Sequence, residues 1–414
     1  MRQHFVIYGI FSLLAASISF AIVPFLSHYL SKEDFGFIGL FMIVMKLFAP
    51  IIGLSMNSII SRSYYLRKDL GELLGSAFIL IFVLTVLVFW VLILLPDILY
   101  VSLGFKLELA LIGLISAFFM TISVTLLAFL QMQEKPVYWG IAMIANTLVS
   151  VALTFLLIVL FELDYLSRLL GILVGQIFSA LIAYYFSKKF IKISFTLNLD
   201  HYRYFYKLGL PLLFTALSGW ALISLDRVFI GSILGMEATG LYVFAITLAS
   251  PVYIIQDVYT RVWGPNAFKM LSKQEEIKLL KWLVYSFVGY IFLGLLFATI
   301  APYLYRIIIG PDFFDSLFLL PWLVFGIVVQ GLQNLLLPFI MHHGKLKVLS
   351  YCAVIGLIVN VLCNFWFIPN MGIQGAALAA IVTNGMISVM YSFYVLKNFY
   401  FNTLNIVPDE VDRV

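Results

Sequence analysis

The sequence predicts an all-α polytopic membrane protein with about twelve transmembrane helices in two six-helix bundles, related as parallel repeats. Three observations predict this class: the apolar composition, the length of the apolar segments and a repeat between the two halves. Hydrophobic residues make up 63% of the 414 residues and charged residues only 11%, whereas soluble domains carry about a quarter charged residues. This composition excludes a soluble enzyme, a nucleic-acid-binding module, a disordered chain and a disulfide scaffold.

Segments of about 20 apolar residues are long enough to cross the hydrocarbon core of a membrane as helices. Twelve such spans follow one another along the chain, at 5–29, 36–60, 73–95, 109–130, 137–160, 169–187, 208–234, 240–260, 282–304, 316–341, 348–369 and 373–396. Runs such as 79–95 are apolar on every face, whereas the strands of a membrane barrel alternate apolar and polar residues. The first span has no convincing small-residue cleavage site, so we expect an uncleaved helix rather than a signal peptide.

The positive charges orient the spans, because loops rich in Lys and Arg stay on the cytoplasmic side. One set of connections, with the N-terminus and the C-terminal tail, holds nineteen of the 25 Lys and Arg residues, and the opposite set holds four. The two others, Lys46 and Arg227, lie inside spans. With an even number of spans, we expect a multi-pass protein with both termini in the cytoplasm.

An internal repeat supports the division into halves. The turns at 30–36 (LSKEDFG) and 234–240 (LGMEATG) share Leu, Glu and Gly at an offset of 204 residues. We expect an N-terminal bundle over 1–187, a basic amphipathic cytoplasmic linker over 188–207, a C-terminal bundle over 208–397 and a cytoplasmic tail over 398–414. The basic and aromatic residues of the linker fit either a segment on the anionic inner leaflet or a solvated connection.

Short motifs along nearly the whole chain carry a family resemblance. They are 30–36 with Gly53-Leu54, then 209–211 (GLP), 224–227 (SLDR) and 240–242 (GLY) around the seventh span, and 371–377 (MGIQGAA) before the twelfth. In order and spacing they resemble the polysaccharide (O-antigen, Wzx-type) flippase family of the multidrug/oligosaccharidyl-lipid/polysaccharide exporter superfamily.

The resemblance implies a flippase that moves an isoprenoid (undecaprenyl)-diphosphate-linked oligosaccharide from the inner to the outer leaflet, for O-antigen or other surface polysaccharide assembly. It implies alternating access of the two bundles around a central cationic cavity, with coupling to an ion gradient and no cofactor. The implied partners are the lipid-linked oligosaccharide, membrane lipids, a glycan polymerase and a chain-length regulator, and no nucleic acid.

Charges inside the spans are the first candidates for a substrate site, because each costs on the order of 2.5–3.5 kcal/mol at a helix centre. Arg suits bidentate contact with a phosphate and Lys offers a point charge, so Lys46 and Arg227 are candidate ligands for a diphosphate. Asp226 lies at comparable depth and could pair with either cation. In the alternative interpretation, Asp226 and Arg227 form a buried lock between helices.

Further candidates lie near the span ends and on one later helix. Arg62 and Arg261 are candidate anion ligands, although both could simply extend to the membrane surface. Asp257 is either an ion relay or the partner of Arg261 four residues later. Gln330, Gln333 and Asn334 share one helix sector and are the best candidates for sugar contacts, with interhelical hydrogen bonds as the alternative. We find no catalytic constellation and no metal-ligand spacing.

Three alternatives remain open. A cation-coupled multidrug exporter of the same superfamily usually carries an acid in its first helix, and residues 5–29 contain none. A membrane-embedded glycosyltransferase or glycan polymerase needs a catalytic acidic pair, and the acids of the external loops are scattered on short turns. Another twelve-helix transporter superfamily carries G-x-x-x-D-R after its second helix, which residues 61–72 (SRSYYLRKDLGE) do not match.

Overall fold

The computed structural model describes residues 2–95, 107–342 and 346–404, and all regular structure in these ranges is helical. Twelve of the described helices are long and apolar enough to cross a membrane, and they coincide with the twelve predicted spans. The direction in which the termini face stays a prediction. The helices are α1 (Arg2–Tyr29), α2 (Lys32–Gly53), α3 (Met56–Ser63), α4 (Leu70–Leu94), α6 (Leu107–Met132), α7 (Pro136–Phe161), α8 (Tyr165–Ser187), α9 (Leu199–Leu234), α10 (Met236–Ser272), α11 (Glu276–Ile308), the 3₁₀ helix η1 (Pro311–Leu319), α12 (Leu320–His342), α13 (Leu346–Met371) and α14 (Ile373–Leu404).

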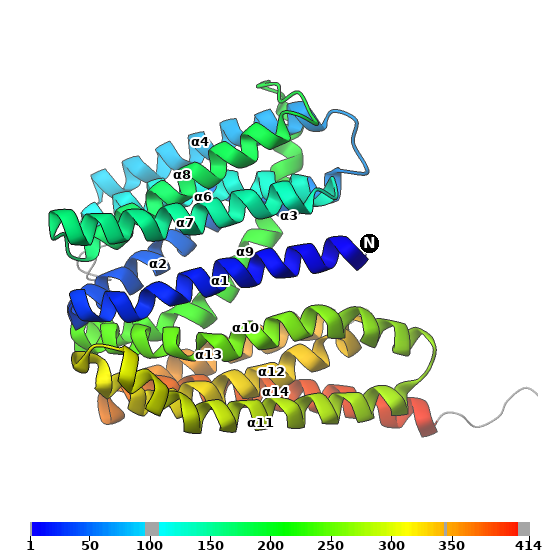
Figure 1. Ribbon diagram of the computed structural model, residues 1–414. Coiled ribbons are helices and arrows are strands. Elements are labelled where there is room, and N and C mark those ends of the chain that lie inside the picture. The colour runs from blue at the N-terminus through cyan, green and yellow to red at the C-terminus, as the bar shows by residue number, and fades with distance from the viewer. Residues whose placement is uncertain (1, 96–106, 343–345, 405–414) are drawn as a thin grey trace, which may run out of the picture. The chain divides into compact units, whose positions relative to one another are not determined.

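The chain forms two compact units. Unit 1 comprises Met1–Thr247 and Tyr305–Ser316, and unit 2 comprises Leu248–Leu304 and Leu317–Val414. In unit 1, α8 packs against α7 and α6, α1 packs against α7, and α2 packs against α6 and α9 (Figure 1). In unit 2, α14 packs against both α12 and α13. These two units are defined by contacts within the chain. The division into two six-helix bundles, expected from the sequence, stays a prediction.

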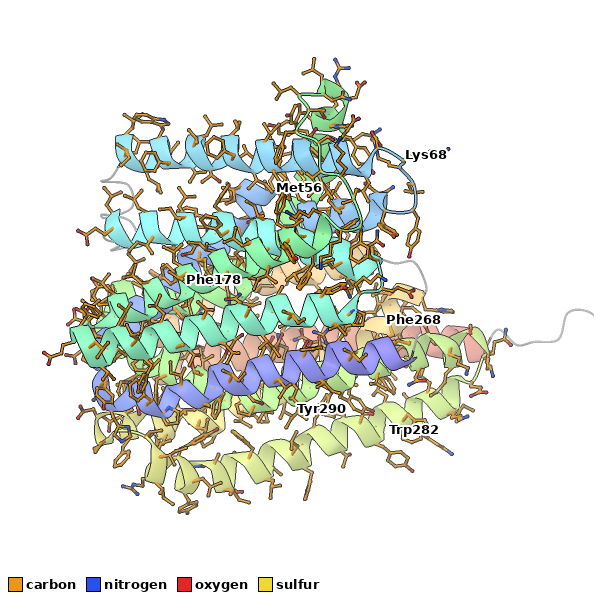
Figure 2. The ribbon with its side chains drawn as sticks, turned by 45° about the horizontal axis from the view of Figure 1, so that its top comes forward. Met56, Lys68, Phe178, Phe268, Trp282 and Tyr290 are labelled. Carbon is orange, nitrogen blue, oxygen red and sulfur yellow. The ribbon has the colours of Figure 1, made fainter. Side chains whose placement is uncertain are left out.

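Large apolar side chains cover the outer surfaces of both units, as expected where the solvent is lipid. Trp282 of α11 is 50% exposed and projects from its helix, and Phe178 of α8 is 44% exposed (Figure 2). Tyr290, two turns after Trp282, is instead buried in the core of unit 2. A helix such as α11 therefore has an apolar outer face as well as an apolar core face.

The turn between α1 and α2 follows from its sequence. Ser31 caps α2, because its hydroxyl accepts a hydrogen bond from the Asp34 backbone N–H at 3.1 Å. The Asp34 carboxylate accepts in return from the Ser31 backbone N–H at 2.9 Å. This capping box satisfies two backbone donors that a helix start otherwise leaves unpaired. The Ser27 hydroxyl of α1 accepts from the Gly310 N–H at 2.9 Å, which fixes segment 305–316 to the same turn.

Two repeat-related glycines form the tightest backbone contact of unit 1. A Cβ added at Gly36 of α2 would collide with the Met236 carbonyl oxygen, and a Cβ added at Gly240 of α10 would collide with the Lys32 carbonyl oxygen. The contact is reciprocal, because residues 32 and 36 correspond to 236 and 240 at the offset of 204 residues. The repeat predicted from the sequence is therefore visible as a local two-fold relation between the starts of α2 and α10.

The linker between the repeats lies along α4. Residues 192–196 have no regular secondary structure, and the Ser194 N–H donates to the Gly71 carbonyl oxygen at 3.2 Å. An added Cβ at Gly71 or Gly75 would collide with a linker carbonyl oxygen, so both glycines are needed for this close approach. Residues 199–207 already belong to α9. The sequence led us to expect a linker on the inner leaflet or a solvated connection, and neither expectation included packing of the linker against α4.

A polar cluster fixes the start of α9 to α4 and the preceding loop. His201 is fully buried, with Nε2 2.9 Å from the Asp69 carboxylate and Nδ1 2.9 Å from the Ser76 hydroxyl. The Ser76 hydroxyl donates to the Thr196 carbonyl oxygen at 2.8 Å, so Nδ1 must donate to Ser76. The bidentate Arg67 guanidinium, followed by His201, holds the pKa of the Asp69 carboxyl well below its usual range.

Candidate functional site

Lys46 and Arg227 lie close together within the membrane-spanning part of unit 1. Lys46 comes from α2 and Arg227 from α9, and their charges act on each other. The two helices are joined nearby, where the Trp220 indole N–H donates to the Ile43 carbonyl oxygen at 3.0 Å. The Lys46 side chain is exposed, whereas the Nε of Arg227 is buried without a hydrogen-bond partner. The geometry therefore brings the two predicted intramembrane cations together.

Asp226 forms no salt bridge with either cation among the described residues, although its charge and that of Arg227 act on each other. Its carboxylate accepts from the Tyr242 hydroxyl at 2.6 Å and from the Arg227 backbone N–H at 2.8 Å. Among the residues that the structure describes, neither Lys46 nor Arg227 forms a salt bridge. The salt bridge between Asp226 and Arg227 that the sequence left open is thus not formed, and Asp226 instead joins α9 to α10. The two cations remain available for an anion.

The second predicted span is broken, which the sequence-based boundaries of 36–60 missed. α2 ends at Gly53, α3 begins at Met56, and Leu54 (φ 42°, ψ 34°) and Ser55 (φ 55°, ψ 38°) are both in the left-handed region. This conformation costs of order 1–3 kcal/mol for each residue other than glycine. Ser55 stands at the start of α3, yet its hydroxyl caps no backbone N–H.

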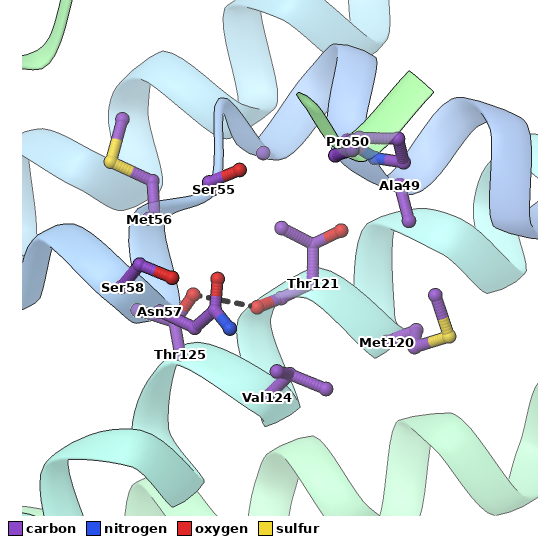
Figure 3. Close-up of a pocket in the computed structure, with 12 residues that line it drawn as sticks. Ala49, Pro50, Ser55, Met56, Asn57, Ser58, Met120, Thr121, Val124 and Thr125 are labelled. Atoms are coloured by element: carbon purple, nitrogen blue, oxygen red, sulfur yellow. Dashed lines mark hydrogen bonds between the residues drawn. The ribbon is translucent and has the colours of Figure 1, made fainter. Parts of the chain in front are cut away.

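A cavity of about 260 Å³ lies beside this break (Figure 3). It is lined by α2, the break, α3, α6 and one residue of α9, all within unit 1. Its polar lining comprises Ser55, Asn57, Ser58, Thr121 and Thr125. None of these side chains carries a charge. None of these five residues is among the site residues predicted from the sequence.

The other predicted cations differ in their surroundings. Arg62 is exposed on α3, one helical turn beyond Ser58, and forms no salt bridge among the described residues. In unit 2, the Arg261 guanidinium donates to the Asp257 carboxylate from Nε at 2.9 Å and from Nη2 at 2.8 Å. Arg261 is therefore already paired, as expected for an i, i+4 pair on an exposed helix face.

The predicted amide group on α12 is divided in the structure. Gln333 donates to the backbone carbonyl and the side-chain oxygen of Asn384 at 2.9 and 3.1 Å, which joins α12 to α14. Gln330 and Asn334 are half-buried, with no side-chain hydrogen bond among the described residues. Gln256 of α10 is 1% exposed and its Nε2 is unpartnered. Burial of a polar group without a partner is rare, and Gln256, a polar residue inside a predicted span, was not among the predicted substrate contacts.

A family model described as "Polysaccharide biosynthesis protein" matches residues 1–271. An uncharacterized membrane protein of Haemophilus influenzae is 24% identical over 409 residues, with 93% of this chain and 95% of the relative covered. The capsular polysaccharide biosynthesis protein CapF of Staphylococcus aureus is 23% identical over 279 residues, with 65% of this chain and 69% of the relative covered. The predicted family is thereby supported by sequence as well as by motifs.

Solved structures show the same fold. The lipid II flippase MurJ in an inward closed conformation matches with a TM-score of 0.78 and 15% identity, over 99% of this chain and 94% of that chain. An inward-facing multidrug resistance MATE family transporter of the MOP superfamily matches with a TM-score of 0.76 and 15% identity, over 95% of this chain and 96% of that chain. The chain is a multi-pass membrane protein with this all-α architecture, and it belongs to the polysaccharide biosynthesis protein family.

Proposed function

We propose that the protein is a flippase for an isoprenoid-diphosphate-linked oligosaccharide, rather than an enzyme. The observation that carries this proposal is the pair of intramembrane cations, Lys46 and Arg227, neither of which forms a salt bridge within the described part of the chain. A charge within the membrane is costly, and two like charges that repel each other are costlier still. A diphosphate would compensate both cations, while the lipid tail of the substrate stays in the bilayer.

The symmetry of the chain supports a transport mechanism. Parallel repeats allow two bundles to tilt alternately around one site, so that the site opens to one side of the membrane at a time. The reciprocal contact of Gly36 and Gly240 brings the two repeats together without intervening side chains. We propose O-antigen or another surface polysaccharide as the product that this translocation serves, in the bacterial inner membrane, with a glycan polymerase and a chain-length regulator acting after it and an ion gradient driving it.

The cation pair also weighs against the second candidate function. An exporter of cationic drugs would bring positive cargo towards Lys46 and Arg227, which would oppose its entry. An anionic substrate experiences the opposite force. The charge of the cargo therefore distinguishes the two functions.

Translocation in proteoliposomes tests the proposal directly. The full chain is reconstituted with undecaprenyl-diphosphate-linked glycan, and arrival of the glycan in the opposite leaflet is measured. We expect Lys46→Ala and Arg227→Ala each to reduce the rate at least tenfold, and Lys46→Arg to retain most of it. Lys269→Ala, which removes an exposed cation at the end of α10, is the matched control. Wild-type rates in both alanine variants, or transport of cationic dyes with no glycan movement, would contradict the proposal.

A further inference from the structure

We propose that the cavity beside the break between α2 and α3 binds the sugar next to the diphosphate of the substrate. This inference rests on the proposed function, because it places one part of that substrate. It assigns the polar residues around Ser55 and Thr121 to a neutral, hydroxyl-rich group, separate from the cations that face the phosphates.

The break is not a requirement of the fold. At the offset of 204 residues, Leu54 and Ser55 correspond to Val258 and Tyr259 in the second repeat. There α10 continues as one helix from Met236 to Ser272. The same span can therefore be built without left-handed residues, and the first repeat keeps a strained conformation that the second does not need. Strain of this kind is concentrated at binding sites.

Packing around the break holds this conformation and turns the polar residues into the cavity. Leu54 and Met56 are buried in the core of unit 1. Gly209 of α9 lies so close that an added Cβ would be 2.9 Å from the Leu54 carbonyl oxygen. Leu54 is held in the core, whereas Ser55, Met56 and Asn57 all line the cavity (Figure 3).

The hydrogen-bonding capacity of the lining fits sugar hydroxyls. Thr121 and Thr125 donate to carbonyl oxygens of their own helix at 2.7 and 2.8 Å, so their hydroxyls can only accept from a ligand. The side chains of Ser55, Asn57 and Ser58 have no hydrogen-bond partner among the described residues and can both donate and accept. A sugar hydroxyl also donates and accepts, whereas a phosphate only accepts and a metal cation needs acceptors alone. The mixed and uncharged lining therefore selects a sugar.

The cavity is also placed correctly relative to the cations. Lys46, Ala49, Pro50 and Gly53 follow the i, i+3, i+4, i+7 spacing of one helix face, and the last three line the cavity. Seven residues of helix span about 10 Å, which is the scale of a diphosphate followed by one sugar ring. A substrate with its phosphates at Lys46 can thus reach the break with its first sugar.

Binding to two probes tests this assignment. The full chain, purified in lipid nanodiscs, is titrated with undecaprenyl diphosphate and with the lipid-diphosphate oligosaccharide fraction from cells in which the chain has been deleted. We expect the wild-type chain to bind the glycan-bearing probe at least tenfold more tightly. Asn57→Ala and Thr121→Val should each reduce this preference roughly three- to tenfold, as expected for one lost hydrogen bond. Lys46→Ala should weaken binding of both probes by the same factor.

Matched controls separate the sugar site from a folding defect. Thr85→Val removes a hydroxyl with the same intrahelical bond on α4, and Ser61→Ala removes one from α3 outside the cavity. Both should retain the wild-type preference. Equal affinity of the wild-type chain for the two probes, or equal weakening of both probes by Asn57→Ala, would overturn the sugar site and leave the proposed function standing. No binding of either probe would overturn both.

Discussion

Replacing Gly240 by Ala perturbs the point where the two repeats touch, and its cost can be estimated from the structure. The new methyl group would overlap the Lys32 carbonyl oxygen and lie 2.9 Å from the Gly36 nitrogen. Both neighbours are backbone atoms of the capped helix α2, so no side chain can rotate away and α2 and α10 themselves must separate. Overpacking usually costs 1–3 kcal/mol, and we expect Gly240→Ala to cost about 3 kcal/mol.

Thermal unfolding of the purified chain in detergent measures this cost. At about 2 °C per kcal/mol for a unit of this size, the apparent midpoint should fall by roughly 6 °C. Gly36→Ala should have a similar effect, and the double variant should cost less than the sum, because one separation of the helices relieves both collisions. Gly219→Ala is the matched control, since its methyl group would meet nothing within 4 Å. If Gly240→Ala unfolds at the same temperature as Gly219→Ala, the contact does not constrain the repeats as described.

Three further predictions concern buried polar groups. Tyr242→Phe removes the hydrogen-bond donor to the buried Asp226 carboxylate and should destabilise the chain by about 1–3 kcal/mol in the same unfolding assay. Tyr290→Phe removes a hydroxyl without a partner among the described residues and should have little effect. Asp69→Asn should release the linker from α4, seen as faster amide hydrogen exchange at residues 192–198, and unchanged exchange there would refute the role of His201. Because the pKa of Asp69 is lowered, its stabilising contribution should be complete above the ordinary carboxyl range and should decline as the pH falls from that range towards the lowered pKa. Protection of residues 192–198 against exchange, corrected for the intrinsic rate, should therefore be weaker at pH 3 than at pH 7.

The predictable part of the fold was the part governed by composition. Apolar length located all twelve spans, and the repeat located the turns that contain Gly36 and Gly240. The broken second span was not predicted, because the left-handed Leu54 and Ser55 depend on packing against Gly209, which is distant in sequence. Pro50 and Gly53, with the polar residues Ser55, Asn57 and Ser58 shortly after them, were the available signal.

The sequence predicted which charged residues lie inside the spans, but it did not predict which groups they pair with. Lys46 and Arg227 stood out because cations are rare inside spans. The Tyr242 hydroxyl donates a hydrogen bond to the Asp226 carboxylate, and only the folded structure shows that this hydroxyl is nearer to the carboxylate than either cation is. The docking of the linker had a signal in the four-residue spacing of Gly71 and Gly75, which permits close approach of another segment.

The reciprocal glycine contact explains which positions of the repeat are alike and which differ. Each half supplies one carbonyl oxygen and, four residues later, one glycine that receives the carbonyl of the other half. Because every residue has the same backbone carbonyl, the position that supplies the carbonyl can be Lys32 in one half and Met236 in the other. The receiving position has no such freedom and is glycine in both. An inserted or deleted residue in the first turn of either helix would move its carbonyl away from the register of its glycine, so the four-residue spacing is kept in both halves although most side chains around it have diverged.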